Sequence, residues 1–440
     1  SSSHGLLRSS KQRGCMGRFS SPFAVMALAL LLVALSFTVS LASEASSSPK
    51  CEATLTKVAD IPTEGNSGFE SWYEDSGDLR LIAASLWDMV SPDMSSGSWI
   101  YNVTSAPKGG LNVVPLQRLA SKGATQAHMI APPMGMSGRS MLLINNHMQC
   151  GGREEAKKSM TPCGPTSIYV QNGPLWEEYK SIKTLGPLKA EHMVIGKGVL
   201  WMVVTENFSD EVSIWNFNSE KYEWTKQGSL AVSGVSDAVL SIVDQSLFVT
   251  TCSKQHPNGG RSSSCPVFAL LESAFHQIQN LPSTGAVDLD AFEFEGEHFL
   301  FVANERSDKD HRVDSHIHKF LKGATMWTLN QTIPTEGARA GHFFVKGGDL
   351  WLGIANFGDM LKGKVESESN LWKYNKGTKQ FDKMVEVDSF GATGWHGFEL
   401  GGHYYVALAN QGHLTAKKYQ TSYVYRLDEK CEGGAGKGEL

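Results

Sequence analysis

The sequence has little charge and lacks the short motifs of the common enzyme classes. Charged residues make up 19% of the 440, against roughly 25% in soluble domains, and the formal net charge is −5. This balance excludes a basic nucleic-acid-binding protein, and a hydrophobic fraction of 41% excludes a disordered chain. There is no nucleotide-binding Gly-rich loop, no Gly-x-Ser-x-Gly elbow and no His-Glu-x-x-His, so kinase and hydrolase functions have no support.

Long apolar stretches are confined to the segment before Ser43. Residues 1–15 lack a start Met and are interpreted as read-through upstream of Met16. The apolar run 23–35, followed by the small residues Ser40 and Ala42, predicts a secretory signal peptide, so residues 1–42 are excluded from the fold. A signal anchor is the alternative, because the run approaches membrane-spanning length. After cleavage we expect no membrane span and a secreted, extracellular protein.

Cysteines are few, and their spacing is regular. Besides Cys15 there are six, of which two pairs are each thirteen residues apart while the other two flank the folded region. The expected disulfides, formed in an oxidising compartment, are Cys150–Cys163, Cys252–Cys265 and Cys51–Cys431. Zinc is the alternative, but no pair has the Cys-x2-4-Cys spacing of a structural zinc site. Three Asn-X-Ser/Thr sites fit a secreted glycoprotein: Asn102, Asn207 and Asn330.

The last third of the chain repeats itself without gaps. Segments 285–304, 337–356 and 391–410 each open with Gly-Ala, and each ends with an apolar run and Ala-Asn. Fainter copies open at Gly65, Gly123, Gly186 and Gly234. The opening glycines therefore mark seven units of 48 to 63 residues. Seven units of this length, with about four short strands each, predict an all-β, seven-bladed β-propeller. The alternative is an irregular pair of β-sandwiches.

The chain ends predict how the ring closes. The seventh unit stops one strand short after residues 423–427, and residues 53–59 form a strand-like segment before the first unit. We expect the N-terminal segment to be the outermost strand of the last blade, which removes an open edge and brings Cys51 near Cys431. That disulfide would contribute about 4 to 5 kcal/mol in the chain-entropy model. Residues 51–431 then form one propeller, and the Gly-rich residues 432–440 a flexible tail.

The repeat resembles the EAR, or epitempin, repeat. The likeness rests on Gly-Ala-x5-Phe, a Gly-containing turn, the run ending in Ala-Asn, an aromatic strand and the restart at residues 334–338. It is close over about residues 280–412 and weaker over 61–279. It implies a seven-bladed extracellular propeller that binds other cell-surface or extracellular proteins. The family's acid three residues after the Gly is present here only as Asp237 and Asp288, so the chain departs from the pattern that an acid-ring calcium site would need.

One position in the repeat gathers ionisable residues. The residue five after each opening Gly is ionisable in six of the seven units, namely Glu70, His128, Glu191, Asp290, His342 and His396. In the fourth unit it is Val239. If the first strand of each blade is innermost, these side chains line the central channel. Neighbouring imidazoles and carboxylates would hydrogen-bond one another, and histidines beside acids would make the channel sensitive to pH. A divalent metal (calcium, iron, zinc or manganese) is the alternative, with His128, His342 and His396 as ligands. General acid/base catalysis is a third reading.

Two further groups are assigned structural roles. Asn304, Asn356 and Asn410, at the ends of the apolar runs, are expected to bond local backbone at a turn rather than to line a pocket. His311, His316 and His318 stand among acidic residues in the loop and strand after Asn304, where we expect a solvated loop rather than a cation site.

The sequence therefore favours a secreted binding module for an extracellular protein or a small ligand. The alternative is a metal-dependent, oxidoreductase-like enzyme in which Glu70, Asp290 or Glu191 would act as base or support the metal ligands. A structural matrix or adhesion role is a further possibility. Fold alone does not choose among these functions.

Overall fold

The computed structural model describes most of the chain from Cys51 onward. Cys51–Leu440 forms one compact unit apart from Ser1–Lys50. The described residues are 51–63, 65–86, 97–131, 139–147, 164–195, 199–218, 221–255, 260–321, 323, 325–412 and 421–431. The expected signal peptide, the Gly-rich tail and the expected bond Cys150–Cys163 lie outside them. Within these ranges, no helix has the length and apolar character needed to cross a membrane.

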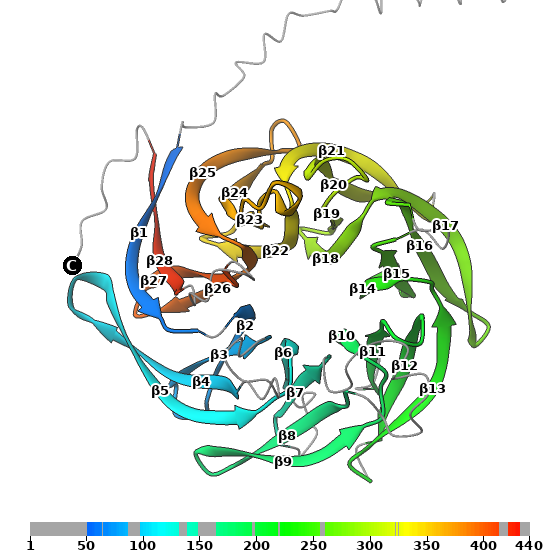
Figure 1. Cartoon of the computed structure of the whole chain (residues 1–440), viewed down its shortest axis with the longest axis horizontal. Coiled ribbons are helices and arrows are strands. Elements are labelled where there is room, and N and C mark those ends of the chain that lie inside the picture. The colour runs from blue at the N-terminus through cyan, green and yellow to red at the C-terminus, as the bar shows by residue number, and fades with distance from the viewer. Residues whose placement is uncertain are drawn as a thin grey trace, which may run out of the picture. The chain divides into compact units, whose positions relative to one another are not determined.

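The described residues fold into seven four-stranded antiparallel sheets placed around a ring (Figure 1). This confirms the prediction of a seven-bladed β-propeller. Within blades 1 to 6 the strands follow chain order from the centre outwards, and blade 7 takes its outermost strand from the N-terminal end. Blade 1 contains β2 (Asn66–Tyr73), β3 (Leu79–Ser85), β4 (Gly97–Ala106) and β5 (Gly110–Ala120); blade 2 contains β6 (Ala124–Ile130), β7 (Met141–Asn146), β8 (Thr166–Asn172) and β9 (Leu175–Ile182); blade 3 contains β10 (Pro187–Ile195), β11 (Val199–Glu206), β12 (Glu211–Asn218) and β13 (Glu223–Ala231); blade 4 contains β14 (Val235–Val243), β15 (Ser246–Ser253), β16 (Ser262–Leu271) and β17 (Ala274–Thr284); blade 5 contains β18 (Ala286–Phe294), β19 (Glu297–Asn304), β20 (Arg312–Leu321) and β21 (Met326–Glu336); blade 6 contains β22 (Ala338–Lys346), β23 (Asp349–Asn356), β24 (Glu366–Asn375) and β25 (Gln380–Phe390); blade 7 contains β26 (Ala392–Leu400), β27 (His403–Asn410), β28 (Ser422–Cys431) and β1 (Cys51–Ile61). Two short 3-10 helices, η1 (Pro107–Gly109) and η2 (Met360–Lys362), lie in connections.

The ring closes as the chain ends predict. Strand β1 pairs with β28 along its whole length, from Cys51 opposite Cys431 to Ile61 opposite Ser422. Cys51 and Cys431 form a disulfide bond between these two strands. On the inner strands, the Thr393 hydroxyl donates a hydrogen bond to the Asn66 carbonyl oxygen at 2.7 Å, which joins blade 7 to blade 1. No sheet edge is left open at the junction of these described strands.

Backbone geometry explains why each unit opens with glycine. All seven opening glycines have φ between 59° and 66°, where other residues are strained. A Cβ atom at Gly285 or Gly337 would also collide with a backbone carbonyl oxygen, of Arg306 or Gly358. The second strand of each blade is apolar on both faces because a neighbouring blade packs on each side, and every residue of β3 and β7 is buried.

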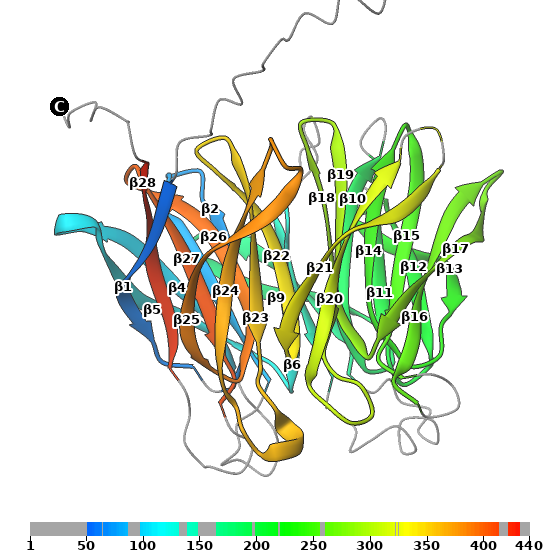
Figure 2. The same ribbon diagram turned by 90° about the horizontal axis from the view of Figure 1, so that it is seen from above.

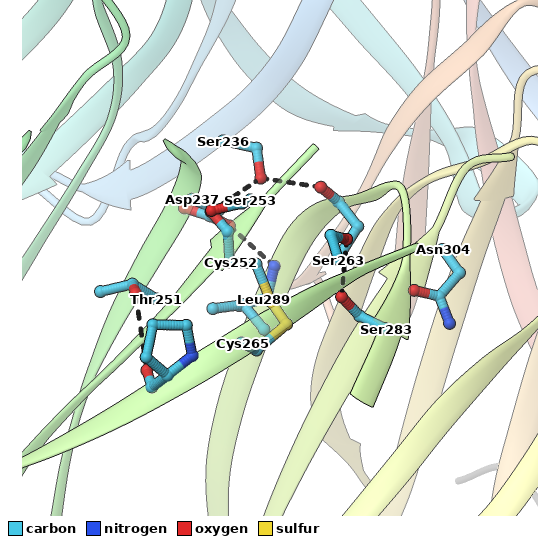
Figure 3. The surroundings of a disulfide bond; sticks show 12 residues. Ser236, Asp237, Thr251, Cys252, Ser253, Ser263, Cys265, Ser283, Leu289 and Asn304 are labelled. Atoms are coloured by element: carbon cyan, nitrogen blue, oxygen red, sulfur yellow. Dashed lines mark hydrogen bonds between the residues drawn. A yellow bond between two sulfur atoms is a disulfide. The ribbon is translucent and has the colours of Figure 1, made fainter. Parts of the chain in front are cut away.

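Hydroxyl side chains on the inner strands link neighbouring blades. The Ser236 Oγ lies 3.1 Å from the Cys252 carbonyl oxygen of its own blade and 2.8 Å from the Ala286 carbonyl oxygen of the next (Figure 3). Ser67, Thr125 and Thr393, which also stand two residues after an opening glycine, contact two blades in the same way. Cys252 and Cys265 form a buried disulfide within blade 4.

Glutamine side chains join the outer strands of neighbouring blades through paired hydrogen bonds, which the sequence analysis does not predict. Gln279 Nε2 donates to the Trp327 carbonyl oxygen at 2.7 Å, and the Trp327 amide donates back to Gln279 Oε1 at 2.9 Å. The same pair of hydrogen bonds joins Gln117 to Trp176 and Gln331 to Phe381. Each glutamine stands six residues before an opening glycine, and each aromatic partner ten residues before the next, so the repeat alignment contains the signal.

The two ends of the ring carry connections of different length (Figure 2). At one end, turns such as 244–245, 295–296 and 401–402 join first to second strands. At the other end, where the opening glycines lie, longer connections join second to third strands in every blade but the third, where the connection 207–210 is short: 86–96, 147–165, 254–261, 305–311, 357–365 and 411–421. We call this end the loop face. Only connection 131–140 is comparably long on the opposite end among those bounded by described strands.

Candidate functional site

The ionisable residues singled out from the repeat lie on the innermost strands. Strands β2, β6, β10, β14, β18, β22 and β26 surround the ring centre (Figure 1). We call their seven side chains the inner ring: Glu70, His128, Glu191, Val239, Asp290, His342 and His396. Each stands at the same register of its sheet, for example Asp290 opposite Phe301 and His342 opposite Gly353.

One part of the inner ring forms a charged pair. His128 Nδ1 lies 3.7 Å from Glu70 Oε2, and His128 Nε2 lies 2.6 Å from His192 Nδ1. Burial lowers the pKa of His128, but Glu191 and Glu70 outweigh burial and raise that pKa above its ordinary value. Burial and His128 lower the pKa of His192 to about 3. When protonated, His128 pairs with the Glu70 carboxylate on one side and donates to the neutral His192 on the other.

The part of the inner ring in blades 5 to 7 is kept neutral. The rings of His342 and His396 stack with their centroids 5.5 Å apart, and His396 Nε2 lies 2.7 Å from the Ser71 hydroxyl of blade 1. Burial and the neighbouring His396 lower the pKa of His342 to about 3. Burial raises the pKa of Asp290 well above its ordinary value, although the Phe343 amide donates to its carboxyl at 2.6 Å. These groups join adjacent blades as uncharged partners.

The three histidines expected as alternative metal ligands are not gathered at one point. His342 and His396 stack on each other, whereas His128 contacts Glu70 and His192. Across the part of the chain that the structure describes, no three His, Cys, Asp or Glu side chains are placed to hold a metal ion. The inner ring thus joins blades in pairs rather than offering a convergent ligand set.

A lysine bridges two buried carboxylates beside the inner ring. Lys189 of β10 forms an ion pair with Asp288 of β18, and its Nζ lies 3.7 Å from Asp237 of β14. Both carboxylates also join blades, because Asp237 Oδ2 accepts the Leu289 amide at 2.7 Å (Figure 3) and Asp288 Oδ2 accepts the Gly341 amide at 2.9 Å. The acids three residues after the opening glycine are therefore blade connectors.

Two carboxylates share one cation in this network, so one of them retains a proton. Burial raises the pKa of Asp237 to about 8; the neighbouring Asp288 acts in the same direction, and Lys189 opposes them. The pKa of Lys189 is itself raised, because its two acidic partners outweigh the effect of burial. The site can thus take up and release a proton near neutral pH.

We expect the contribution of Asp237 to the free energy of unfolding to fall by on the order of 2 kcal/mol between about pH 6.5 and 8.5. The folded state holds a proton on Asp237 that the unfolded state, with a pKa of 3.8, has released, so this stability is lost as pH rises through about 8. The raised pKa of His128 acts in the same direction. His192 and His342 act in the opposite direction, because their lowered pKa values contribute stability that is present above about pH 6.5 and is lost as pH falls toward about 3.

Urea unfolding followed by tryptophan fluorescence at the two pH values measures this slope. Asp237→Asn keeps a hydrogen-bond acceptor and removes the titration, so the variant should show a flatter profile. An equal slope in the variant and the wild type would refute the assignment to Asp237.

Several residues of this region are not among those that the sequence singles out. Lys189 and Gln126 stand three residues after an opening glycine, where the related repeats have an acid, and His192 follows Glu191 directly. Gln126 Oε1 nevertheless accepts the Ala190 amide at 2.6 Å, so it joins two blades as Asp237 and Asp288 do. The connecting role of this position extends beyond its acidic members.

The expectation of a solvated loop after Asn304 is wrong for His311 and His318, which are buried. Connection 305–311 folds back against blade 6, where the Gly337 amide donates to the His311 carbonyl oxygen at 2.7 Å. His318 lies on β20, the strand expected after this loop, opposite Leu300 of the inward-lying β19. Contact with the next blade at His311, and the position of His318 in the third strand of its sheet, are not shown by the local sequence.

The expected glycosylation sites are all partly exposed. Asn207 Nδ2 donates to the Val235 carbonyl oxygen at 3.0 Å, and Asn330 Nδ2 to the Lys379 carbonyl oxygen at 3.3 Å. Asn102 accepts a hydrogen bond from Arg80. Glycosylation at these positions stays a prediction.

Comparisons with known proteins agree with the repeat and the fold. Residues 274–317 match the EPTP domain family. The thrombospondin-type laminin G domain and EAR repeat-containing protein of Mus musculus is 35% identical over 98 residues, which cover 22% of this chain and 15% of that protein. Its Homo sapiens counterpart is 40% identical over 93 residues, which cover 21% and 14%. The matched segment is thus a small part of those relatives.

Solved structures resemble this one in fold alone. A Bacteroides uniformis protein provisionally described as a 6-phosphogluconolactonase has a TM-score of 0.50 at 12% identity, over 76% of this chain and 87% of that one. A Bacteroides fragilis protein with the same description has a TM-score of 0.50 at 10% identity, over 75% and 86%. Identities this low carry no inference about activity.

Proposed function

We propose that this chain is an extracellular protein that binds other proteins through its loop face. It is an EAR-repeat β-propeller, and such propellers typically serve as interaction modules. Two observations support the compartment. The structure contains disulfides Cys51–Cys431 and Cys252–Cys265, a feature of oxidising environments. The relatives that share its repeat carry, by name, a thrombospondin-type laminin G domain.

The observation that carries the proposal is an ordered apolar tip on the loop face. In connection 357–365, the buried Asp359 side chain accepts the amides of Leu361 and Lys362 at 3.1 and 3.2 Å, and it forms an ion pair with Lys362. This arrangement presents Met360 and Leu361, with exposed fractions of 38% and 51%. An apolar pair held in place from within loses little conformational entropy on binding, as a partner-binding surface requires.

An ionic network centred on the buried Glu305 lies against the tip. Arg339 of β22 pairs with Glu305 at 2.8 Å, and Glu305 pairs with Lys254 at 2.6 Å. The Arg339 guanidinium also lies over the Phe357 ring, 4.7 Å from its centroid, and 3.5 Å from the Met360 sulfur. Burial raises the pKa of Glu305, but Arg339 and Lys254 outweigh it and lower that pKa to about 2. Burial and Arg339 lower the pKa of Lys254 to about 8, so the network is ionised below that pH, and it ties the loops of blades 4, 5 and 6 together.

Binding to an array of purified extracellular domains tests the proposal. We expect the wild type to bind at least one domain, and Leu361→Asp to weaken that binding by about tenfold or more, because a charge replaces an apolar contact. The matched control is Leu271→Asp, since Leu271 is 47% exposed at the opposite end of blade 4. It should bind as the wild type does. Binding that is absent, or equal in the wild type and both variants, would contradict the proposal.

A further inference from the structure

A groove separates the outer strands of blades 5 and 6. It has a volume of about 830 Å³ and is lined by the starts of β20 and β24 and the ends of β21 and β25. This volume falls in the range of ligand-binding clefts, roughly 300 to 1,000 Å³. Neither the inner ring nor the tip formed by Met360 and Leu361 contributes to its lining. We call it the acidic groove.

The lining side chains leave an excess of negative charge. Of its six acids, Glu336 pairs with Arg312 and Glu386 with Lys383. The other four have no ion-pair partner in the described part of the chain: Asp314, Glu366, Glu368 and Asp388. Lys364 is the remaining cation of the lining. Exposed carboxylates concentrated in a concave surface attract a cationic partner.

Two of these acids oppose each other directly. Glu368 of β24 stands opposite Asp388 of β25 in the antiparallel register, and both are exposed. Like charges at directly opposed positions destabilise a strand pair. A bound ammonium or guanidinium group would relieve this repulsion, because it can donate charge-assisted hydrogen bonds to the carboxylates of both strands.

A buried acceptor in the groove also lacks a donor. Asn356 lines the groove, is 4% exposed, and its Oδ1 has no hydrogen-bond partner among the described residues, although its Nδ2 donates to the Glu368 carbonyl oxygen at 2.7 Å. The corresponding oxygen of Asn304 accepts the Thr284 amide at 3.0 Å, and that of Asn410 accepts the Phe390 amide at 3.2 Å. Buried acceptors are rarely left unsatisfied, so this one indicates an N–H donor from a ligand.

The equivalent groove between blades 1 and 2 is different. It has a volume of about 470 Å³, and its charged lining residues are Arg118, Lys122 and Glu178. The Oδ1 of Asn146, the counterpart of Asn356, accepts the Lys122 amide at 2.9 Å. The acidic lining and the unsatisfied amide are therefore not a property of every blade junction.

We infer that the acidic groove binds a lysine- or arginine-rich segment of another polypeptide. Its volume exceeds the needs of a single ion, and within the described ranges no three acidic or histidine side chains are placed to hold a metal. An extended basic segment supplies several cations to the separated carboxylates and an N–H donor to Asn356. This surface is separate from the apolar tip and would provide a second contact.

Fluorescence anisotropy with labelled hexalysine tests the inference, at physiological ionic strength and in the full-length protein. We expect saturable binding that Glu368→Gln/Asp388→Asn weakens by about tenfold or more. The matched control, Glu177→Gln/Glu178→Gln on β9, removes the same charge beside the other groove and should bind within about twofold of the wild type. The melting temperature of Glu368→Gln/Asp388→Asn should equal or exceed that of the wild type, which excludes misfolding as the cause of weaker binding.

Three outcomes would overturn the inference. The first is no binding of hexalysine to the wild type. The second is an equal loss in both double variants, which would show an effect of net charge alone. The third is a melting temperature that calcium raises only when Glu368 and Asp388 are intact, with calcium displacing hexalysine, which would indicate an ion site. Leu361→Asp should not weaken hexalysine binding, so failure here is distinguishable from failure of the loop-face proposal.

Discussion

Replacing both Cys51 and Cys431 by serine is expected to lower the free energy of unfolding by about 5 kcal/mol. The two residues are 380 apart in sequence, so their bond removes much of the entropy of the unfolded chain. Cys431 is exposed and Cys51 only partly buried, so serine leaves no cavity in the core. The loss is expected to arise mainly in the unfolded state.

Urea unfolding separates this mechanism from lost native contacts. Without the bond the unfolded chain expands, so the dependence of unfolding free energy on urea should steepen. Cys252→Ser/Cys265→Ser is the control for the urea dependence, because that bond spans a separation of 13 and contributes about 3 kcal/mol rather than about 5 through the unfolded chain. A loss below about 1 kcal/mol with an unchanged urea dependence would show that the ring stays closed by strand pairing alone.

Lys189→Met is expected to destabilise the protein by about 3 kcal/mol. Asp237 and Asp288 are buried, and Lys189 is the cation that both contact. Methionine fills a similar volume but leaves the carboxylate that this pair of acids retains at pH 7 without a positive partner, and a buried charge without one is costly. The blade-to-blade bonds from Asp237 to Leu289 and from Asp288 to Gly341 weaken as a result.

The midpoint of urea unfolding at pH 7 measures this effect against Lys226→Met. Lys226 pairs with Glu211 at 2.7 Å, but the pair lies on the surface, so its loss should cost less than about 1 kcal/mol. Adding Asp288→Asn to Lys189→Met should restore part of the stability, because it removes one unpaired charge. Equal losses in Lys189→Met and Lys226→Met would contradict the role assigned to the network.

The inner ring illustrates how far sequence reasoning reaches toward the site. The spacing from each opening glycine is sufficient to place Glu70, His128, Asp290, His342 and His396 on the innermost strands. It does not show that His342 and His396 stack while His128 turns to Glu70 and His192, because those contacts depend on how neighbouring blades are rotated and spaced. Whether three side chains converge on one point, as a metal site requires, therefore depends on the rotation and spacing of the blades.

The number of blades, the strand order and the closure of the ring follow from local patterns in the sequence. Opening glycines need a positive φ, strands buried on both faces need continuous apolar residues, and both requirements repeat along the chain. Which charges meet depends on the packed ring instead. Lys189 reaches Asp288 across two blade junctions, and Glu368, Asp388 and Asn356 share one groove with strands of another blade. Local patterns encode backbone conformation, whereas these encounters require segments far apart in sequence to pack together.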